Sequence, residues 1–373
     1  MIQGNRIEVS MRQFEFSSRS LSKLADSWQM LESHSYNVSF FTSWNWIEAI
    51  LAIEYANTYV LTATKDGRVI GLAILGYQPP NLKNGFNHSL WLNKLGDPGL
   101  DQPWIEYNDF LLDGEQESTA RSAMWNYLLR QSVRPWTRIH LDMMNRIALA
   151  ELSVDGLTVR QKMRDKGFIK TLSEQEHSLL KTFSKNTRSQ LARSRRLLQP
   201  MIADFKVRDS IVGKQACFEQ IASQHRKQWR SSEWGSGFDN PAFVSFHQAL
   251  FSKPQIEIAE LSLKTGEKAF LYNFIYGNKV YFYLSCVPKL QDNKIKLGLV
   301  LHLMAMEHYQ SLGLLYYDFL AGDARYKRSL SDVEYELESF EISRKTALNQ
   351  AISNLRRIKQ AMKRIILGRN VNH

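Results

Sequence analysis

The sequence predicts an α/β (α+β) protein built from two similar halves and a helical tail. Its 373 residues suit two or three domains, because a domain usually has ~100–200 residues. Both halves repeat one coarse order of elements: helices, a meandering hairpin, a helix and a strand. Hydrophobic residues make up 44% of the chain and charged residues 23%, which is typical of a folded protein with enough apolar surface for two cores.

The first half, residues 1–170, contains a hairpin with a strong turn signal. Lys65-Asp66-Gly67 separates two β-rich runs, and Asp-Gly between apolar runs is typical of a tight hairpin. Ser20 and Ser43 are placed to cap two helices. The expected elements are a strand over 12–17, a helix over 21–31, a helix after Ser43, strands over 59–64, 68–77 and 107–112, a helix over 118–131 and a strand over 138–143.

The second half, residues 171–344, opens with a long basic helix over 177–199. Helices over 217–230 and 241–252 follow, and the latter has Asn240 as its cap and Pro241 at the favoured first position. Gly313 is placed to end a further helix. The remaining elements are strands over 255–263, 268–276 and 279–285, a loop over 286–297, a helix over 298–312 and a strand over 314–320.

A basic amphipathic helix is expected over 345–367, in the tail formed by residues 345–373. Apolar residues recur at helical spacing from Leu348 to Ile366, with lysines and arginines between them. The apolar stripe either docks on the body of the protein or on a second subunit, or it gives peripheral contact with an anionic membrane. Both interpretations remain open.

Composition narrows the class of partner and the compartment. The net charge of +11 and the pI of about 9.5 favour anionic partners such as coenzyme A, nucleotides, tRNA or lipid headgroups, unless the surface is simply basic. Cys217 and Cys286 form neither a disulfide framework nor a metal cluster, which favours the cytoplasm. No apolar run reaches ~18 residues, and the start lacks a signal-peptide pattern. No metal is expected, because the nine histidines show no metal-ligand spacing.

The stretch 268–328 carries the residues suited to chemistry. Lys294 and Lys296 precede Gly298 at a helix start, where free N–H groups and a partial positive charge can hold a pyrophosphate. The preceding strand ends near Ser285. Beyond the following apolar strand come two carboxylates, a phenol and a lysine: Asp318, Asp323, Tyr326 and Lys327. A purely structural alternative is an ion-pair network that closes the sheet.

An ordered set of segments gives the chain a family resemblance. The segments are Phe183-Ser184-Lys185-Asn186-Thr187-Arg188, His225 with Trp229, Tyr281-Phe282-Tyr283-Leu284-Ser285, Gly298, and Asp318 to Asp323 with Tyr326-Lys327. With Phe41 to Trp46 in the first half, they resemble the GNAT-type acetyltransferase domain of the CelD-like (cellulose-biosynthesis-associated) group, which is related to Fem-type peptidoglycan aminoacyltransferases. The resemblance implies tandem GNAT-like domains, each a mixed, mostly antiparallel sheet flanked by helices. The first half lacks a glycine-rich or basic loop before its last helix, so we expect the N-terminal domain to be non-catalytic and to shape the acceptor site at the domain junction.

The resemblance further implies direct transfer of an acyl group from acyl-CoA, most often acetyl-CoA, to an amine. Asp318 and Asp323 are the candidate bases, with Tyr316, Tyr317 and Tyr326 as neighbours that could raise a carboxyl pKa. His225 is the alternative base, although it could simply pack on Trp229. Tyr326 would protonate the leaving thiolate, and Lys327 would orient Asp323 or bind phosphate. Ser285 would lie where adjacent strands splay to receive the donor. Trp229, Tyr283 and Trp234 are candidate substrate contacts, with Tyr283 equally suited to the core.

Three functions therefore remain open at the level of sequence. The first is an acyl-CoA-dependent N-acyltransferase, acting on an amino sugar or related metabolite in polysaccharide or cell-envelope biosynthesis. The second is an aminoacyl-tRNA-dependent transferase, with Lys185, Arg188 and Arg195 of the basic helix as tRNA contacts. The third is a GNAT-like scaffold without catalytic activity.

Overall fold

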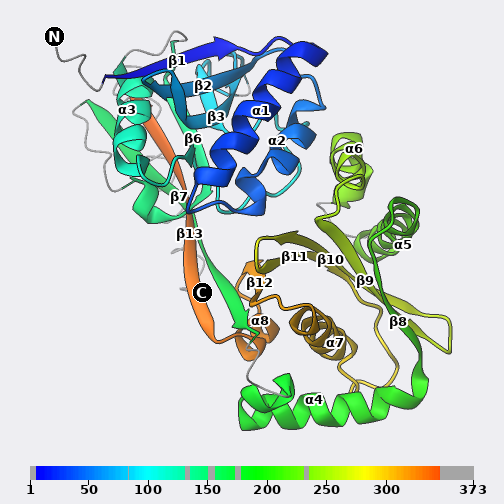
Figure 1. Ribbon diagram of the computed structural model, residues 1–373. Helices are drawn as coiled ribbons and strands as arrows, with labels where there is room; N and C mark the ends of the chain where they lie inside the picture. The colour runs from blue at the N-terminus through cyan, green and yellow to red at the C-terminus, as the bar shows by residue number, and fades with distance from the viewer. Residues whose placement is uncertain are drawn as a thin grey trace, which may run out of the picture.

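The computed structural model describes residues 6–82, 84–130, 135–149, 156–172, 178–230 and 235–344. The chain forms two lobes that are joined by a pair of long strands (Figure 1). The helices of the N-terminal lobe are α1 (Ser18–His34), α2 (Trp44–Leu51) and α3 (Glu117–Arg130). Its strands are β1 (Ile7–Gln13), β2 (Thr58–Lys65), β3 (Arg68–Gln78), β4 (Ser89–Leu92), β5 (Leu111–Leu112) and β6 (Arg138–Met144).

The C-terminal lobe places helices on both faces of its strands. Its strands are β8 (Ile202–Arg208), β9 (Ile256–Leu263), β10 (Lys268–Tyr276), β11 (Lys279–Cys286) and β12 (Tyr316–Ala321). Its helices are α4 (Lys185–Leu198), α5 (Ile211–Trp229), α6 (Pro241–Leu250), α7 (Leu297–Ser311) and α8 (Arg325–Leu330). Buried side chains of α5 and α6 pack on one face of the strands, and those of α4 and α7 on the other.

Two strands, β7 (Leu157–Thr171) and β13 (Val333–Arg344), run through both lobes and make the sheet continuous. Within the described residues the sheet has 13 strands in the order β1-β2-β3-β4-β6-β13-β7-β12-β11-β10-β9-β8, with β5 on β3. Only β4 with β6 and β11 with β12 are parallel among these pairs. The mixed, mostly antiparallel sheet flanked by helices is therefore confirmed. In the part of the chain that is described, no helix has the length and apolar character needed to cross a membrane.

Opposite charges face each other along the two connecting strands. Arg164 on β7 pairs with Glu336 at 2.5 Å and with Glu338 at 3.2 Å on β13. Lys166 pairs with Glu334 at 2.5 Å. Cross-strand pairs of opposite charge stabilise an antiparallel ladder, so these side chains fix the register of strands that few apolar residues support.

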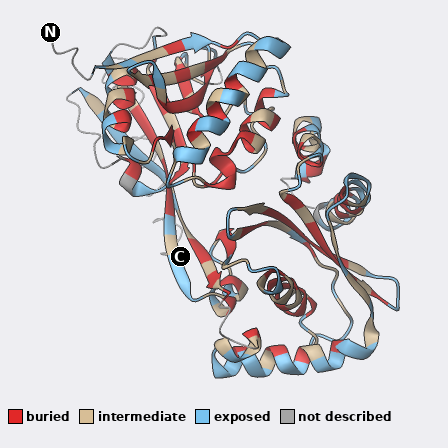
Figure 2. Cartoon of the chain, viewed as in Figure 1, coloured by how far each residue is buried: buried red, intermediate tan, exposed pale blue. Residues whose placement is uncertain are grey.

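One aromatic cluster packs the lobes against each other. Phe40 stacks on Phe274 of β10 with ring centroids 4.4 Å apart, and Phe41 meets Tyr281 of β11 edge to face at 5.9 Å. All four side chains are buried, and Figure 2 shows such buried residues concentrated inside both lobes. The lobes therefore share a core in addition to the β7–β13 connection.

The predicted elements are mostly in place, with some errors at their ends. Strand 12–17 is wrong, because β1 spans Ile7–Gln13 and Ser17, not Ser20, caps α1: its hydroxyl accepts from the Ser20 N–H at 3.2 Å. The strand at 107–112 is reduced to Leu111–Leu112. Helix 177–199 begins only at Lys185, after the cap Ser184. The tail helix predicted over 345–367 lies outside the described residues.

Candidate functional site

Strands β11 and β12 separate partway along their length. They pair in parallel over Lys279–Tyr281 and Tyr316–Asp318. Beyond that point β11 stays with β10 as far as Cys286, whereas β12 follows β7, with Ala321 opposite Gly167. The backbone of β12 is irregular there, since Leu320 has a φ of 59°. The predicted splay is confirmed, and it leaves one edge of β11 without a strand partner in the described structure.

The amino end of α7 lies at the end of the loop that follows β11. Helix α7 begins at Leu297, and within the described part of the chain the N–H groups of residues 297–299 have no hydrogen-bond partner. Lys294 and Lys296 are exposed beside it, as is Ser285 on β11. Nothing crowds Gly298, because a Cβ there would meet only Val287, at 3.8 Å. These features suit the pyrophosphate of coenzyme A.

Asp318 is fully buried where β11 and β12 separate. Its Oδ1 accepts from the Tyr335 hydroxyl at 2.8 Å and from the Leu320 N–H at 2.9 Å, and its Oδ2 accepts from the Tyr107 hydroxyl. Lys279 Nζ lies 3.9 Å from Oδ2. Burial raises the Asp318 pKa, while Lys279 and these donors oppose the rise. The carboxylate is therefore enclosed by partners.

Two of the aromatic neighbours predicted for Asp318, Tyr317 and Tyr326, are wrong. Side chains alternate along β12, so Asp318 faces the N-terminal lobe while Tyr317 packs in the core beneath α7. Tyr326 lies on that other side as well, stacked on His302 with ring centroids 5.5 Å apart, and burial raises its pKa to about 12. The tyrosines that enclose Asp318 come instead from distant segments, as Tyr107 and Tyr335.

Asp323 does not share the Asp318 site. It is exposed and pairs with Arg328 at 2.6 Å. Lys327 is buried, and its ammonium donates to the carbonyls of Leu320 at 3.3 Å and Ala321 at 2.6 Å. The predicted contact between Lys327 and Asp323 is therefore wrong. Its cause is the turn at residue 322, which folds α8 back over the end of β12.

The remaining predicted residues lie around α5 and β11. His225 Nδ1 lies 2.8 Å from the Ser236 hydroxyl, and burial lowers the His225 pKa. Tyr283 accepts the backbone N–H of Trp104 at 2.8 Å and packs among aromatic rings, so it contributes to the core and also contacts the N-terminal lobe. The side chain of Trp229 and the whole of Trp234 lie outside the described residues.

Glu106 is a site residue that sequence reasoning missed. Its Oε2 accepts the Ala321 N–H at 2.8 Å, and its Oε1 accepts the Trp104 indole N–H at 3.1 Å. Only 2% of Glu106 is exposed. Burial raises its pKa to about 8; the Ala321 N–H opposes the rise and the negative Asp318 adds to it. A carboxyl group with this pKa can exchange a proton near neutral pH.

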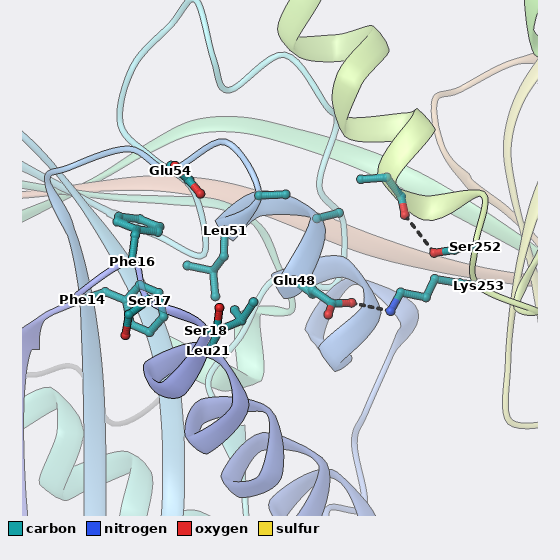
Figure 3. Close-up of a pocket in the computed structure, with 13 residues that line it drawn as sticks. Phe14, Phe16, Ser17, Ser18, Leu21, Glu48, Leu51, Glu54, Ser252 and Lys253 are labelled. Atoms are coloured by element: carbon teal, nitrogen blue, oxygen red, sulfur yellow. Dashed lines mark hydrogen bonds and ion pairs between the residues drawn. The ribbon is translucent and has the colours of Figure 1, made fainter.

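A separate cavity of about 540 Å³ lies between the lobes (Figure 3). Phe14, Phe16 and Leu51 line it from the N-terminal lobe. Glu48 of that lobe pairs with Lys253, which follows α6, across the opening. None of the sequence-predicted site residues lines this cavity, so it is distinct from the β11–β12 opening.

Residues 185–328 match the family model described as acetyltransferase (GNAT) domain. This segment runs from α4 into α8 and contains both the α7 amino end and Asp318. The C-terminal lobe therefore carries a GNAT-type acyltransferase domain. No curated protein sequence matches the chain.

Several solved structures share the fold at low sequence identity. The crystal structure of FemX is 13% identical over 85% of this chain and 95% of its own, with a TM-score of 0.58. A conserved protein of unknown function from Bacteroides thetaiotaomicron VPI-5482 is 12% identical over 86% and 97%, with a TM-score of 0.53. The C-terminal domain of a putative lysylphosphatidylglycerol synthetase from Agrobacterium fabrum is 9% identical over 90% and 95%, with a TM-score of 0.52. These similarities extend over both lobes and concern the fold alone.

Proposed function

We propose that this GNAT-type acyltransferase moves an acyl group from acyl-CoA, with acetyl-CoA as the first candidate, to an amine. The observation that carries the proposal is the opening between β11 and β12 beside the free amino end of α7, within the segment matched by the GNAT family model. An acyl-CoA has an anionic end, an amide-bearing arm and a reactive thioester. The opening offers partners for the first two of these parts.

The donor would be held by groups of the C-terminal lobe. The unpaired N–H groups of residues 297–299, with Lys294 and Lys296, suit the pyrophosphate. The free edge of β11 up to Ser285 offers backbone groups to the amides of the arm. When bound, the thioester supplies an acyl carbon that is open to attack by an amine.

The acceptor would enter from the N-terminal lobe, whose loop between β4 and β5 covers the opening. Trp104 and Tyr283 connect that loop to β11. An amino sugar of polysaccharide or cell-envelope biosynthesis, used in the cytoplasm, is the acceptor we favour, on the basis of the resemblance to the CelD-like group. In this scheme Asp318 holds Tyr107 and Tyr335 in place and does not act as the base.

Binding of acetyl-CoA, measured by calorimetry and thermal shift, tests the proposal. We expect a rise in the melting temperature with ligand, because a ligand that binds only the folded state stabilises it. Exchange of Lys294 and Lys296 for alanine should weaken binding roughly tenfold or more. Lys264→Ala, an exposed lysine in a turn of the same lobe, serves as the control. Absence of binding by acetyl-CoA, longer acyl-CoA and free coenzyme A would remove the proposal, whereas binding without thiol release on addition of amines would favour a scaffold.

Helix α4 favours an aminoacyl-tRNA donor as the second candidate. The chain contains no acidic residue between Glu176 and Asp204, and Lys185, Arg188 and Arg196 are exposed on this helix. Arg195, predicted as a tRNA contact, pairs with Glu307 at 2.7 Å and is less available. This candidate predicts tRNA binding that weakens steeply with salt and is lost when the three exposed residues are replaced by alanine. Salt-insensitive binding, or none, argues against it.

A further inference from the structure

We infer that Glu106, contributed by the N-terminal lobe, is the group that accepts the proton of the attacking amine. The inference rests on the proposed acyl transfer and adds a catalytic residue to it. It differs from the sequence-based expectation, in which the N-terminal domain takes no part in the chemistry.

The position of Glu106 is fixed from both sides of the opening. Its Oε2 accepts the N–H of Ala321 on β12, three residues beyond the last pair that β12 forms with β11. The neighbouring Trp104 donates its backbone N–H to the hydroxyl of Tyr283 on β11, two residues beyond that same pair. The segment that carries Glu106 therefore bridges the two strands where they have separated, which is where a thioester lying between them would present its carbonyl.

Other ionisable groups at the opening are less suited to this role. Asp318 is fully buried and accepts from three donors. Asp323 is exposed and paired with Arg328. By contrast, each oxygen of Glu106 accepts one hydrogen bond and keeps a lone pair for a proton.

The groups that face Glu106 come from several elements. Asp318 of β12 and Lys327 of α8 act on its charge in opposite directions, and the tyrosines of the cluster, Tyr283 and Tyr335, stay neutral because burial raises their pKa values. Burial is the dominant effect on the pKa of Glu106, because the carboxylate of Asp318 raises this pKa and the ammonium of Lys327 lowers it. The resulting pKa lies near the pH at which a general base is most useful.

Trp104 controls access to this carboxyl group. Its indole N–H covers Oε1, and 47% of the residue is exposed. A ring that is half in solvent can swing away without leaving a cavity in the core. The acceptor amine would then replace the indole N–H as the hydrogen-bond donor to Oε1 of Glu106.

The transfer balances with Glu106 as the acceptor of one proton. The amine nitrogen forms a C–N bond to the acyl carbon, and the C–S bond breaks with its electron pair leaving on sulfur. The proton lost by the nitrogen passes to the Glu106 carboxylate, so the products are an amide, a thiolate and a protonated Glu106. Release of that proton to water restores the base.

The test compares Glu106→Gln and Glu106→Asp with Glu115→Gln, an exposed glutamate of the same lobe. Thiol release from acetyl-CoA is followed with glucosamine and other amines from pH 6 to 9. We expect Glu106→Gln to lose about a hundredfold or more in rate, the usual contribution of a general base, while acetyl-CoA binding stays within about twofold. The wild-type rate per unit of unprotonated amine should rise with pH to a plateau above about 8, and this rise should disappear in the variant. Glu115→Gln should match the wild type.

A titration without substrate separates this inference from the proposed function. Because the Trp104 indole contacts Glu106, fluorescence should change with a midpoint near pH 8 in the wild type, and this change should be absent in Glu106→Gln and Trp104→Phe. Lack of that midpoint overturns the role of Glu106 whether or not an amine is turned over. Normal acyl transfer by Glu106→Gln, with an unchanged pH profile, overturns the role of Glu106 but leaves the proposed function in place. Failure of the wild type to bind acetyl-CoA overturns the proposed function and this role together.

Discussion

Replacing Asp318 with alanine should strongly destabilise the protein, whereas the same change at Asp323 should not. The two carboxylates are five residues apart in the sequence but lie in opposite environments. Asp318 is fully buried and accepts from three donors, and Asp323 is exposed in a single ion pair. The pair therefore tests whether the enclosed cluster is a structural anchor.

The magnitude follows from the groups that Asp318→Ala leaves behind. The N–H of Leu320 loses its acceptor, and the hydroxyls of Tyr107 and Tyr335 keep only each other as partners. Each buried polar group without a partner costs ~1–3 kcal/mol. Removal of a carboxylate whose pKa is raised by burial offsets part of this cost, and water entering the space offsets more. A net loss of about 3 kcal/mol is expected, a large share of the ~5–15 kcal/mol that usually holds a protein folded.

Urea titration of both variants gives the comparison. Asp323→Ala should lose less than ~1 kcal/mol, because an exposed ion pair contributes little. Asp318→Asn should fall between wild type and Asp318→Ala, since asparagine keeps one acceptor oxygen in the same place. If Asp318→Ala unfolds at nearly the same urea concentration as Asp323→Ala, the cluster does not anchor the junction and the reasoning is wrong.

Three further outcomes are expected. Gly167→Ala should cost about 1–3 kcal/mol, because the new Cβ would lie 2.0 Å from the Tyr335 ring; a crystal structure of the variant with an unmoved ring would refute this. Arg164→Ala should lower the unfolding free energy by more than ~1 kcal/mol, because it removes the partner of the buried Glu338 carboxylate. A double-mutant cycle with Glu338→Gln that shows no coupling would contradict this. Burial raises the folded-state Glu106 pKa from 4.5 to about 8, so its contribution to stability is full below 4.5 and is lost as the pH rises towards 8. Relative to Glu106→Gln, the wild type should therefore lose about 3 kcal/mol of unfolding free energy between pH 5.5 and 8, at ~1.4 kcal/mol per pH unit. If the unfolding free energies of the two proteins run parallel over this pH range, the prediction is wrong.

Local signals in the sequence explain which elements could be predicted. Asp66 and Gly67 both have positive φ, as a tight hairpin turn requires, and Asn240 accepts from two N–H groups at the start of α6. Strands β7 and β13 were missed because their exposed positions carry arginine, lysine and glutamate, which have weak strand preference. Those strands form because the charges of one complement the charges of the other, and the two lie more than 160 residues apart in the chain.

In the candidate site, too, the features with local sequence signals could be predicted and those made by distant segments could not. The amino end of α7 could be predicted, since a glycine and two lysines at a helix start are adjacent in the sequence. Asp318 was singled out as a candidate base, and the structure encloses it among Tyr107 and Tyr335, which come from other segments. Glu106 gave no signal of its own, because it stands alone in a loop and acquires its pKa from burial against a strand 215 residues away.

Two residues with strained backbone conformations hold the lobes in a fixed relative position at their junction. Tyr107 and Leu320 have φ values of 49° and 59°, a region that residues with side chains seldom occupy and that costs of order 1 kcal/mol or more. Both residues donate to Asp318, one through its hydroxyl and the other through its N–H. The same two turns carry Glu106 and Ala321, whose hydrogen bond joins the lobes. Relaxation of either turn would move Glu106 away from the end of β12, so the strain is the physical cost of holding the carboxyl group of one lobe over the opening in the other.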